Sequence, residues 1–179
     1  AIVTGAGGGI GKQHALELAK RGAKVVVNDL GGSVDGSGTS DAAEQVVDEI
    51  ISIGGEAIAN GASVTDLEAV KEMTQHTLEK WGRIDILVNN AGILRDKSFH
   101  KVTMDDFNLV MDVHFQGTLN CTHTIFPIMR EQEYGRIIFT SSSSGVFGNF
   151  GQTNYGSAKM AMVGLMNTLK LEGQNKNVF

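Results

Sequence analysis

A glycine-rich segment directly after the first apolar run restricts what this chain can fold into. The apolar residues Ala1–Thr4 lead without a break into Gly5-Ala6-Gly7-Gly8-Gly9-Ile10-Gly11, and a helical pattern follows. Backbone N–H groups at a helix start carry partial positive charge, and glycines let a phosphate group approach them. The spacing therefore predicts a pyrophosphate site at Gly5, Gly9 and Gly11. A flexible turn without a ligand is the alternative, which the preceding strand and following helix make weaker.

Short apolar segments alternate with amphipathic segments along the whole chain. Most of the apolar segments lack strict polar alternation, which predicts strands that are covered on both faces. They are Ala1–Thr4, Ala23–Asn28, Glu56–Ala59, Ile84–Asn89 and Gly135–Thr140. Helices are predicted over Gly11–Arg21, Asp41–Ile53, Thr65–Lys80, Thr103–Asp112, Phe115–Gln132 and Thr153–Glu172. Gly22 ends the first helix at its C′ position, and Thr65 with Glu68 forms a capping box before the third.

This alternation predicts an α/β fold, a doubly wound parallel sheet of Rossmann type. Right-handed crossovers place helices on both faces, and ligands then bind at the carboxyl ends of the strands. Residues 1–179 are therefore expected to form a single dinucleotide-binding domain. Both ends look truncated, because no initiator Met precedes the first strand and Val178-Phe179 resembles the start of another strand.

Charge and composition argue against several kinds of partner. The net charge of −5 disfavours nucleic acid, because no surplus of basic residues is available for phosphates. No apolar run approaches the length of a bilayer span, and no secretory leader precedes the first strand. Cys121 is the only cysteine, so no internal disulfide can form, and the five histidines lack metal-site spacing. We expect an intracellular protein that binds no metal, membrane or nucleic acid.

The residue that ends the second strand indicates which dinucleotide binds. Asp29 lies close to the expected distance after the glycines, where a carboxylate accepts hydrogen bonds from ribose hydroxyls. It also repels a 2′-phosphate, and no Arg or Lys follows within the next residues to hold one. The sequence therefore favours NAD over NADP, with an ordinary loop acid as the alternative. The long loop Gly31–Ser40 follows where the adenosine ribose is expected.

Two other strands are followed by small and polar residues. Asn89-Asn90-Ala91-Gly92 closes the fourth strand, where small residues let a cofactor lie against the backbone. A simple Asn-rich turn is the alternative there. Thr140–Gly145 ends the fifth strand with a run of serines. One of these hydroxyls can orient a substrate oxygen, and most of the others are interpreted as a polar loop.

Tyr155 and Lys159 are spaced i, i+4 and share a face of the last predicted helix. A free phenol loses its proton only near pH 10, and a nearby ammonium favours the phenolate. A phenolate can take a proton from an alcohol or return it to a carbonyl. Such a pair alone is usually an ordinary helix surface. Its place after the fifth strand, together with the dinucleotide motif, predicts hydride transfer between an alcohol carbon and a nicotinamide.

In combination these motifs resemble the short-chain dehydrogenase/reductase family over the whole chain. The family pattern of Thr-Gly-x-x-x-Gly-x-Gly, Asn-Asn-Ala-Gly and Tyr-x-x-x-Lys is complete here. The resemblance implies that Tyr155 is the acid/base, Lys159 holds the nicotinamide ribose, and Ser142 is the serine of the site. It implies cofactor contacts at Gly5, Gly9, Ile10, Gly11, Asp29, Leu30, Ser63, Val64, Asn90, Ala91, Gly92, Tyr155 and Lys159.

Two positions depart from the general family pattern. The family has an Asn at its fourth catalytic position, whereas Val113-His114-Phe115 stands there in this chain. In the family this residue helps hold a water molecule on the proton path to the lysine. His114 is therefore expected to act as a catalytic residue through its backbone carbonyl or its ring. Ser63-Val64 replaces the Asp-Val pair that touches the adenine in many members.

A narrower resemblance concerns Val27–Gly32 with the long loop, Asn89–Asp96 and Gly148–Tyr155. These segments are similar to the (3R)-hydroxyacyl-CoA dehydrogenase unit of peroxisomal multifunctional β-oxidation enzymes and their bacterial relatives. The resemblance implies NAD-dependent oxidation of (3R)-3-hydroxyacyl-CoA, in the peroxisome of a eukaryote or the cytoplasm of a bacterium. It also implies a homodimer that pairs Phe115–Gln132 and Thr153–Glu172 across a two-fold axis. A steroid or other alcohol as substrate, and a non-catalytic NAD-binding module, are the alternatives.

Overall fold

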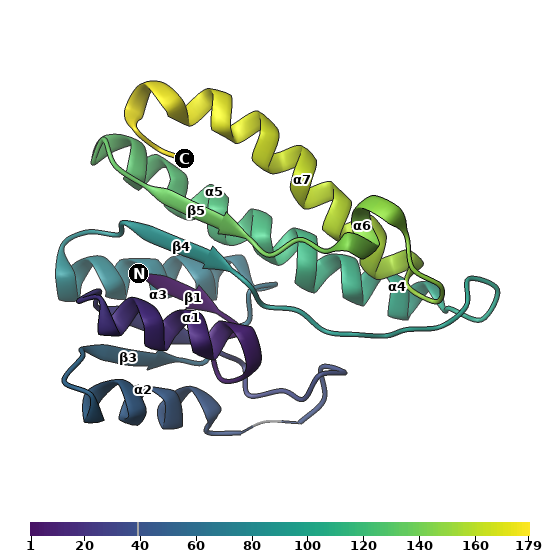
Figure 1. Ribbon diagram of the computed structural model, residues 1–179, viewed down its shortest axis with the longest axis horizontal. Helices are drawn as coiled ribbons and strands as arrows, with labels where there is room; N and C mark the ends of the chain where they lie inside the picture. The colour runs from purple at the N-terminus through teal and green to yellow at the C-terminus, as the bar shows by residue number, and fades with distance from the viewer. Residues whose placement is uncertain (39) are drawn as a thin grey trace.

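The computed structural model describes residues 1–38 and 40–179, and Figure 1 shows a sheet with helices on both sides. Thr39, in the predicted long loop, lies outside the described residues. The strands are β1 (Ile2–Thr4), β2 (Val25–Asn28), β3 (Ala57–Asn60), β4 (Ile86–Asn89) and β5 (Arg136–Phe139). They pair in parallel in the order β3-β2-β1-β4-β5. The predicted doubly wound parallel sheet is therefore confirmed.

The helices follow the predicted pattern, with three elements that the sequence did not predict, α6, η1 and η2. Their bounds are α1 (Gly9–Lys20), α2 (Ala42–Ser52), α3 (Leu67–Trp81), α4 (Met104–Met111), the π-helical turn η1 (Asp112–Gln116), α5 (Gly117–Glu131), α6 (Ser143–Phe147), α7 (Thr153–Gly173) and the 3₁₀ turn η2 (Gln174–Lys176). In the part of the chain that the structure describes, every helix is too short or too polar to cross a membrane.

Successive strand residues pack on opposite sides of the sheet. Ile2 and Val26 join side chains of α3 and α5 in one buried cluster, whereas Val3, Val25 and Val27 join those of α1 and α2 in another. All five are fully buried. Because neighbouring residues of a strand face opposite ways, a sheet covered on both sides needs apolar residues at consecutive positions. This explains why the strands lack polar alternation in the sequence.

The start of α3 differs from the prediction. Asp66, rather than Thr65, caps the helix, and its carboxylate accepts hydrogen bonds from the backbone N–H groups of Glu68 and Ala69 at 3.0 and 3.1 Å. The Thr65 hydroxyl instead pairs with Ser63 at 2.8 Å. A carboxylate is the stronger acceptor and its charge complements the helix dipole, so the predicted capping box is wrong by one residue.

The predicted helices Thr103–Asp112 and Phe115–Gln132 form one continuous rod rather than two separate helices. Met111, Asp112 and Gly117 all keep right-handed helical backbone angles, and η1 joins α4 to α5. No proline or glycine stands between Met111 and Gly117 to break the helix. The wider π-helical turn accommodates an extra residue, a feature frequent at functional sites. It carries His114, which is buried.

β1 lies in the middle of the sheet, where the direction of chain progression reverses. From β1 the chain adds β2 and β3 on one side, then crosses back to add β4 and β5 on the other. A crevice forms beyond the carboxyl ends of strands at such a reversal, and α/β sheets bind ligands there. The fold therefore places the ends of β1 and β4, with the segments that follow them, at a binding site.

Candidate active site

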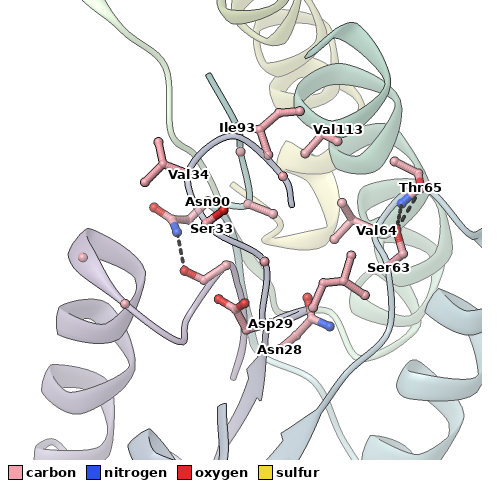
Figure 2. A pocket seen from close by; sticks show the side chains of 18 of the residues that line it. Asn28, Asp29, Ser33, Val34, Ser63, Val64, Thr65, Asn90, Ile93 and Val113 are labelled. Carbon is pink, nitrogen blue, oxygen red and sulfur yellow. Dashed lines mark hydrogen bonds between the residues drawn. The ribbon is translucent and has the colours of Figure 1, made fainter. Parts of the chain in front are cut away.

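A cavity of about 530 Å³ lies at this reversal point, between the segments that follow β1, β2, β3 and β4 (Figure 2). Its wall includes most residues predicted to contact a cofactor: Gly5, Gly9, Asp29, Leu30, Ser63, Val64, Asn90, Ala91 and Gly92. Ile10 and Gly11 do not line it, because Ile10 is 65% exposed and Gly11 is buried against the loop. Tyr155 and Lys159 also stand outside the lining, on α7.

The glycines that follow β1 are required for two different reasons. Gly5 and Gly9 have φ angles of +61° and +51°, which side-chain-bearing residues rarely adopt. At Gly11 the obstacle is space, since a Cβ atom there would lie 2.1 Å from the Gly5 carbonyl oxygen. α1 begins at Gly9, two residues before the predicted start, because the loop turns directly into the first helical turn. The positive end of the α1 dipole therefore lies at the cavity wall.

Asp29 projects into this cavity and is fixed by the backbone (Figure 2). Its Oδ2 accepts a hydrogen bond from the Gly7 N–H at 2.8 Å, and its Oδ1 accepts one from the Gly31 N–H at 2.7 Å. A carboxylate has about four acceptor positions, so both oxygens can still accept hydrogen bonds from a ligand. None of the described residues that line the cavity is Arg or Lys.

Asn90 ties the end of β4 to the end of β1. Its side-chain amide donates to the carbonyl oxygens of Thr4 and Gly5, both at 3.0 Å. The Thr4 hydroxyl accepts the backbone N–H groups of Asn90 and Ala91, again at 3.0 Å. A Cβ atom on Gly5 would lie 2.8 Å from Ala91 Cα. The Asn-Asn-Ala-Gly segment is therefore a structural joint at the cavity and not a simple turn.

Sequence reasoning missed polar residues that support the cavity from behind. Asn28 is buried, and its amide donates to Asn60 Oδ1 at 2.8 Å and to the Ala62 carbonyl at 2.9 Å. Asn120 on α5 donates to the Val64 carbonyl at 2.9 Å. These bonds hold the segment after β3 at the cavity. A buried polar residue within an apolar run, as at Asn28, was the only signal in the sequence.

Lys159 is buried beside the end of β5 and close to Tyr155. Its ammonium donates to the Thr140 carbonyl at 2.5 Å and lies 5.4 Å from the centre of the Tyr155 ring. Only 2% of the residue is exposed, and this burial lowers the pKa of Lys159 to about 8. The Ser141 hydroxyl donates to the Lys159 carbonyl at 3.0 Å. The structure thus brings the predicted lysine and tyrosine together at the carboxyl edge of the sheet.

Ser142 stands at the start of α6, which packs against α7. Its Oγ accepts the Ser144 N–H at 3.2 Å and caps the short helix. The two helices approach closely through glycines, since a Cβ on Gly156 would lie 2.9 Å from the Ser144 carbonyl oxygen. A Cβ on Gly145 would lie 3.0 Å from the backbone nitrogen of Met160. This packing positions Ser142 relative to the helix that carries Tyr155 and Lys159.

His114, on η1, lies beside Tyr155. Its ring meets the Tyr155 ring edge to face, with centroids 5.1 Å apart. Its Nε2 lies 2.8 Å from the oxygen and 3.1 Å from the nitrogen of Ile93, a residue that lines the cavity. Burial, together with the nearby Lys159 ammonium, lowers the pKa of His114 to about 4. His114 therefore links Tyr155 to the cavity wall and stays neutral near physiological pH.

No group of three or more His, Cys, Asp or Glu side chains among residues 1–38 and 40–179 is placed to hold a metal ion. This edge of the sheet holds a buried ammonium, a phenol and a hydroxyl, with a neutral imidazole beside the phenol. They lie next to a cavity with a glycine loop at one end. This arrangement combines a proton-transfer group with a site of dinucleotide character.

Comparison with known proteins identifies the family of this chain. Residues 1–179 match the family model for short chain dehydrogenases. Peroxisomal multifunctional enzyme A of Dictyostelium discoideum is 58% identical to the chain, and peroxisomal multifunctional enzyme type 2 of Drosophila melanogaster is 56% identical, each over 99% of it. The chain spans 40% of the first relative's length and 29% of the second's.

A solved structure extends the comparison to the fold. It is a 7α-hydroxysteroid dehydrogenase complexed with NADH and 7-oxo glycochenodeoxycholic acid. The two folds agree with a TM-score of 0.89 at 33% identity, over 99% of this chain and 66% of the other. The chain is therefore an oxidoreductase that belongs to the short-chain dehydrogenase family.

Proposed function

We propose that this protein oxidises (3R)-3-hydroxyacyl-CoA to 3-ketoacyl-CoA with NAD. The observation that carries the proposal is a continuous line of contacts from the dinucleotide-type cavity to the proton-transfer group. Ile93 lines the cavity, His114 contacts Ile93, and Tyr155 contacts His114. The two relatives support an acyl-CoA substrate, because their names mark them as peroxisomal multifunctional enzymes, the group whose dehydrogenase unit this sequence resembles, and each match covers 99% of the chain.

The cavity fits a dinucleotide on physical grounds. Its volume of about 530 Å³ is in the range of ligand sites. The start of α1 offers N–H groups to a pyrophosphate, and the glycine loop keeps side chains away from it. Asp29, held by Gly7 and Gly31, offers its remaining acceptor positions to ribose hydroxyls. A carboxylate at this place disfavours a 2′-phosphate, which supports NAD rather than NADP.

The chain's own groups move the proton in this mechanism. Tyr155 takes the proton of the substrate hydroxyl, and the Lys159 ammonium, 5.4 Å from its ring, stabilises the resulting phenolate. Ser142 accepts one bond from Ser144, and its own hydroxyl hydrogen remains to donate to the substrate oxygen. A nicotinamide held in the cavity would supply the acceptor for the hydride of the carbinol carbon, so that the alcohol would become a ketone.

Replacement of Tyr155 by Phe tests this function. Because the phenol is the proton acceptor, we expect NADH formation with a (3R)-3-hydroxyacyl-CoA to fall by at least about 100-fold, whereas NAD binding measured by calorimetry is retained. Tyr134→Phe is the matched control, since Tyr134 lies before β5 and is 37% exposed; it should leave turnover unchanged. Undiminished turnover by Tyr155→Phe would contradict the mechanism.

The substrate and cofactor are tested in the same assay with the unaltered chain. A steroid alcohol is the second candidate substrate, because the 33% identical structure is that of a hydroxysteroid dehydrogenase. We expect the hydroxyacyl-CoA to be turned over with a higher kcat/KM than the steroid, and NAD to be preferred over NADP. If the steroid is preferred, the substrate is a steroid alcohol rather than the hydroxyacyl-CoA. Preference for NADP would refute the role proposed for Asp29.

We also propose a homodimer that forms through α5 and α7. The exposed positions of α7 recur at helical spacing and are small or apolar at several places, at Ser157, Met160, Gly164, Asn167 and Leu171. A smooth stripe of this kind suits close packing against a second copy of the helix. By their names, the relatives favour a peroxisomal location if the source is a eukaryote, and we expect the cytoplasm if it is a bacterium.

A further inference from the structure

The ring of His114 is enclosed by three different parts of the chain. Tyr155 on α7 meets it edge to face, Ile93 after β4 contacts Nε2, and Gly92 packs against Cε1. A Cβ atom on Gly92 would lie 2.2 Å from Cε1, so only glycine leaves room for the ring. The residue is 3% exposed. A side chain enclosed in this way has a single position, and it restricts the positions of the groups that it touches.

One nitrogen of the ring pairs with the main chain. Nε2 lies 2.8 Å from the Ile93 oxygen and 3.1 Å from the Ile93 nitrogen, and a neutral imidazole can satisfy only one of them. A protonated Nε2 donates to the Ile93 oxygen, and an unprotonated Nε2 accepts the Ile93 N–H. Either tautomer therefore ties the ring to Ile93 through Nε2, whereas Nδ1 is buried without a partner in the described structure.

Burial and the nearby Lys159 ammonium keep the ring neutral. The Lys159 ammonium on α7 opposes a second positive charge, and the other group that faces the ring from α7 is the uncharged phenol of Tyr155. Burial has the larger effect, and together they lower the pKa of His114 to about 4. A ring with a pKa of about 4 does not change its protonation state near neutral pH, so it does not serve as the acid or base there.

We propose that His114 is a positioning residue, whose Nε2 pairs with the main chain of Ile93 and whose ring fixes Tyr155 relative to the cavity wall. The proposal rests on the function proposed above, because the positioned group is its proton acceptor. It differs from the sequence expectation of a catalytic residue: His114 acts through Tyr155 and Ile93. It also gives Gly92 a role, since a side chain there would displace the ring that orients the tyrosine.

Two amide variants separate the two nitrogen atoms of the ring. The Gln amide reaches the place of Nε2, whereas the Asn amide reaches only the place of Nδ1. We expect His114→Gln to keep a kcat close to that of the unaltered chain, because its amide can pair with the main chain of Ile93 either as donor or as acceptor. We expect His114→Asn and His114→Phe to lower kcat by about 10-fold or more, as loss of a buried hydrogen bond does. His123→Gln and His123→Asn, at an exposed position of α5, are the matched controls and should change nothing.

The pH profile of kcat distinguishes positioning from a merely structural role. In His114→Asn and His114→Phe the rising limb should shift, because a displaced phenol no longer keeps its place beside the Lys159 ammonium. The limb should not move in His114→Gln. The proposal would be overturned if kcat falls in proportion to thermal stability in every variant and the rising limb does not shift. Loss of the limb in all three variants would make His114 an acid–base residue instead.

Two further outcomes are decisive against the proposal. An active Asn variant with an inactive Gln variant would assign the effect to the Nδ1 edge. Crystal structures of the Gln and Asn variants give a readout that needs no substrate: the Tyr155 ring should keep its place in the first and move in the second. An unmoved ring in the Asn variant refutes the positioning role. Failure of the unaltered chain to oxidise the hydroxyacyl-CoA refutes only the substrate assignment, and the variants are then compared by this structural measure.

Discussion

At the scale of single residues, the burial of Lys159 makes the free energy of unfolding depend on pH. The Lys159 pKa is about 8 in the folded chain, against 10.5 for a lysine in water, and desolvation is the cause. Between these two values the unfolded chain binds more protons than the folded chain does. The free energy of unfolding must therefore rise with pH across this window. Below about pH 8 both states hold the proton, and the penalty of burial is present in full.

Comparison of the unaltered chain with Lys159→Met tests this linkage. The shift of about 2.5 pKa units corresponds to about 3 kcal/mol. We expect the free energy of unfolding of the unaltered chain, relative to the variant, to rise by about that amount between about pH 7 and about pH 11. Urea denaturation at a series of pH values measures the difference. A difference that stays constant with pH would show that Lys159 is not desolvated in the folded protein.

At the scale of elements, the cap of α3 predicts different effects on stability for substitutions at two neighbouring residues. Asp66→Ala removes the acceptor of two backbone N–H groups, so we expect the free energy of unfolding to fall by about 1 kcal/mol. Thr65→Ala should change it by less than about 0.5 kcal/mol, because Thr65 does not cap the helix. Urea denaturation of both variants checks the order. A larger loss of stability in Thr65→Ala than in Asp66→Ala would support the capping box predicted from the sequence.

Elements also show where local patterns stop being informative. The sequence placed α1, α2, α3, α4, α5 and α7 close to where they lie. Apolar residues recur at helical spacing in most of them, whereas α7 carries apolar residues on both its buried and its exposed faces. It did not predict α6, since the serines of Ser141–Ser144 are typical of loops and favour the helix only through the Ser142 cap. It did not predict η1 either, because a π-helical turn depends on the packing of His114 and leaves no periodic pattern of its own.

At the scale of the whole molecule, the dimer proposed through α5 and α7 has a direct test. We expect light scattering to give twice the mass of the chain. Met160→Glu combined with Leu171→Glu should halve it, because charges in the α7 stripe oppose close packing of two helices. Ile51→Glu is the control, since Ile51 on α2 is similarly exposed at 56%. A single-chain mass for the unaltered protein would contradict the proposal.

By itself the sequence predicted the fold class, the glycine loop and the neighbouring positions of Tyr155 and Lys159 on one helix face. These follow from spacing along the chain, because strand and helix periods and the i, i+4 relation are local properties. Only the tertiary structure decided that Asn90 fastens to Thr4, that Asp29 is held by Gly7, and that the imidazole of His114 stands against Tyr155. Those contacts join residues distant in the chain. They form only when both sides of the sheet are packed, and no pattern along the chain contains the distances that packing creates.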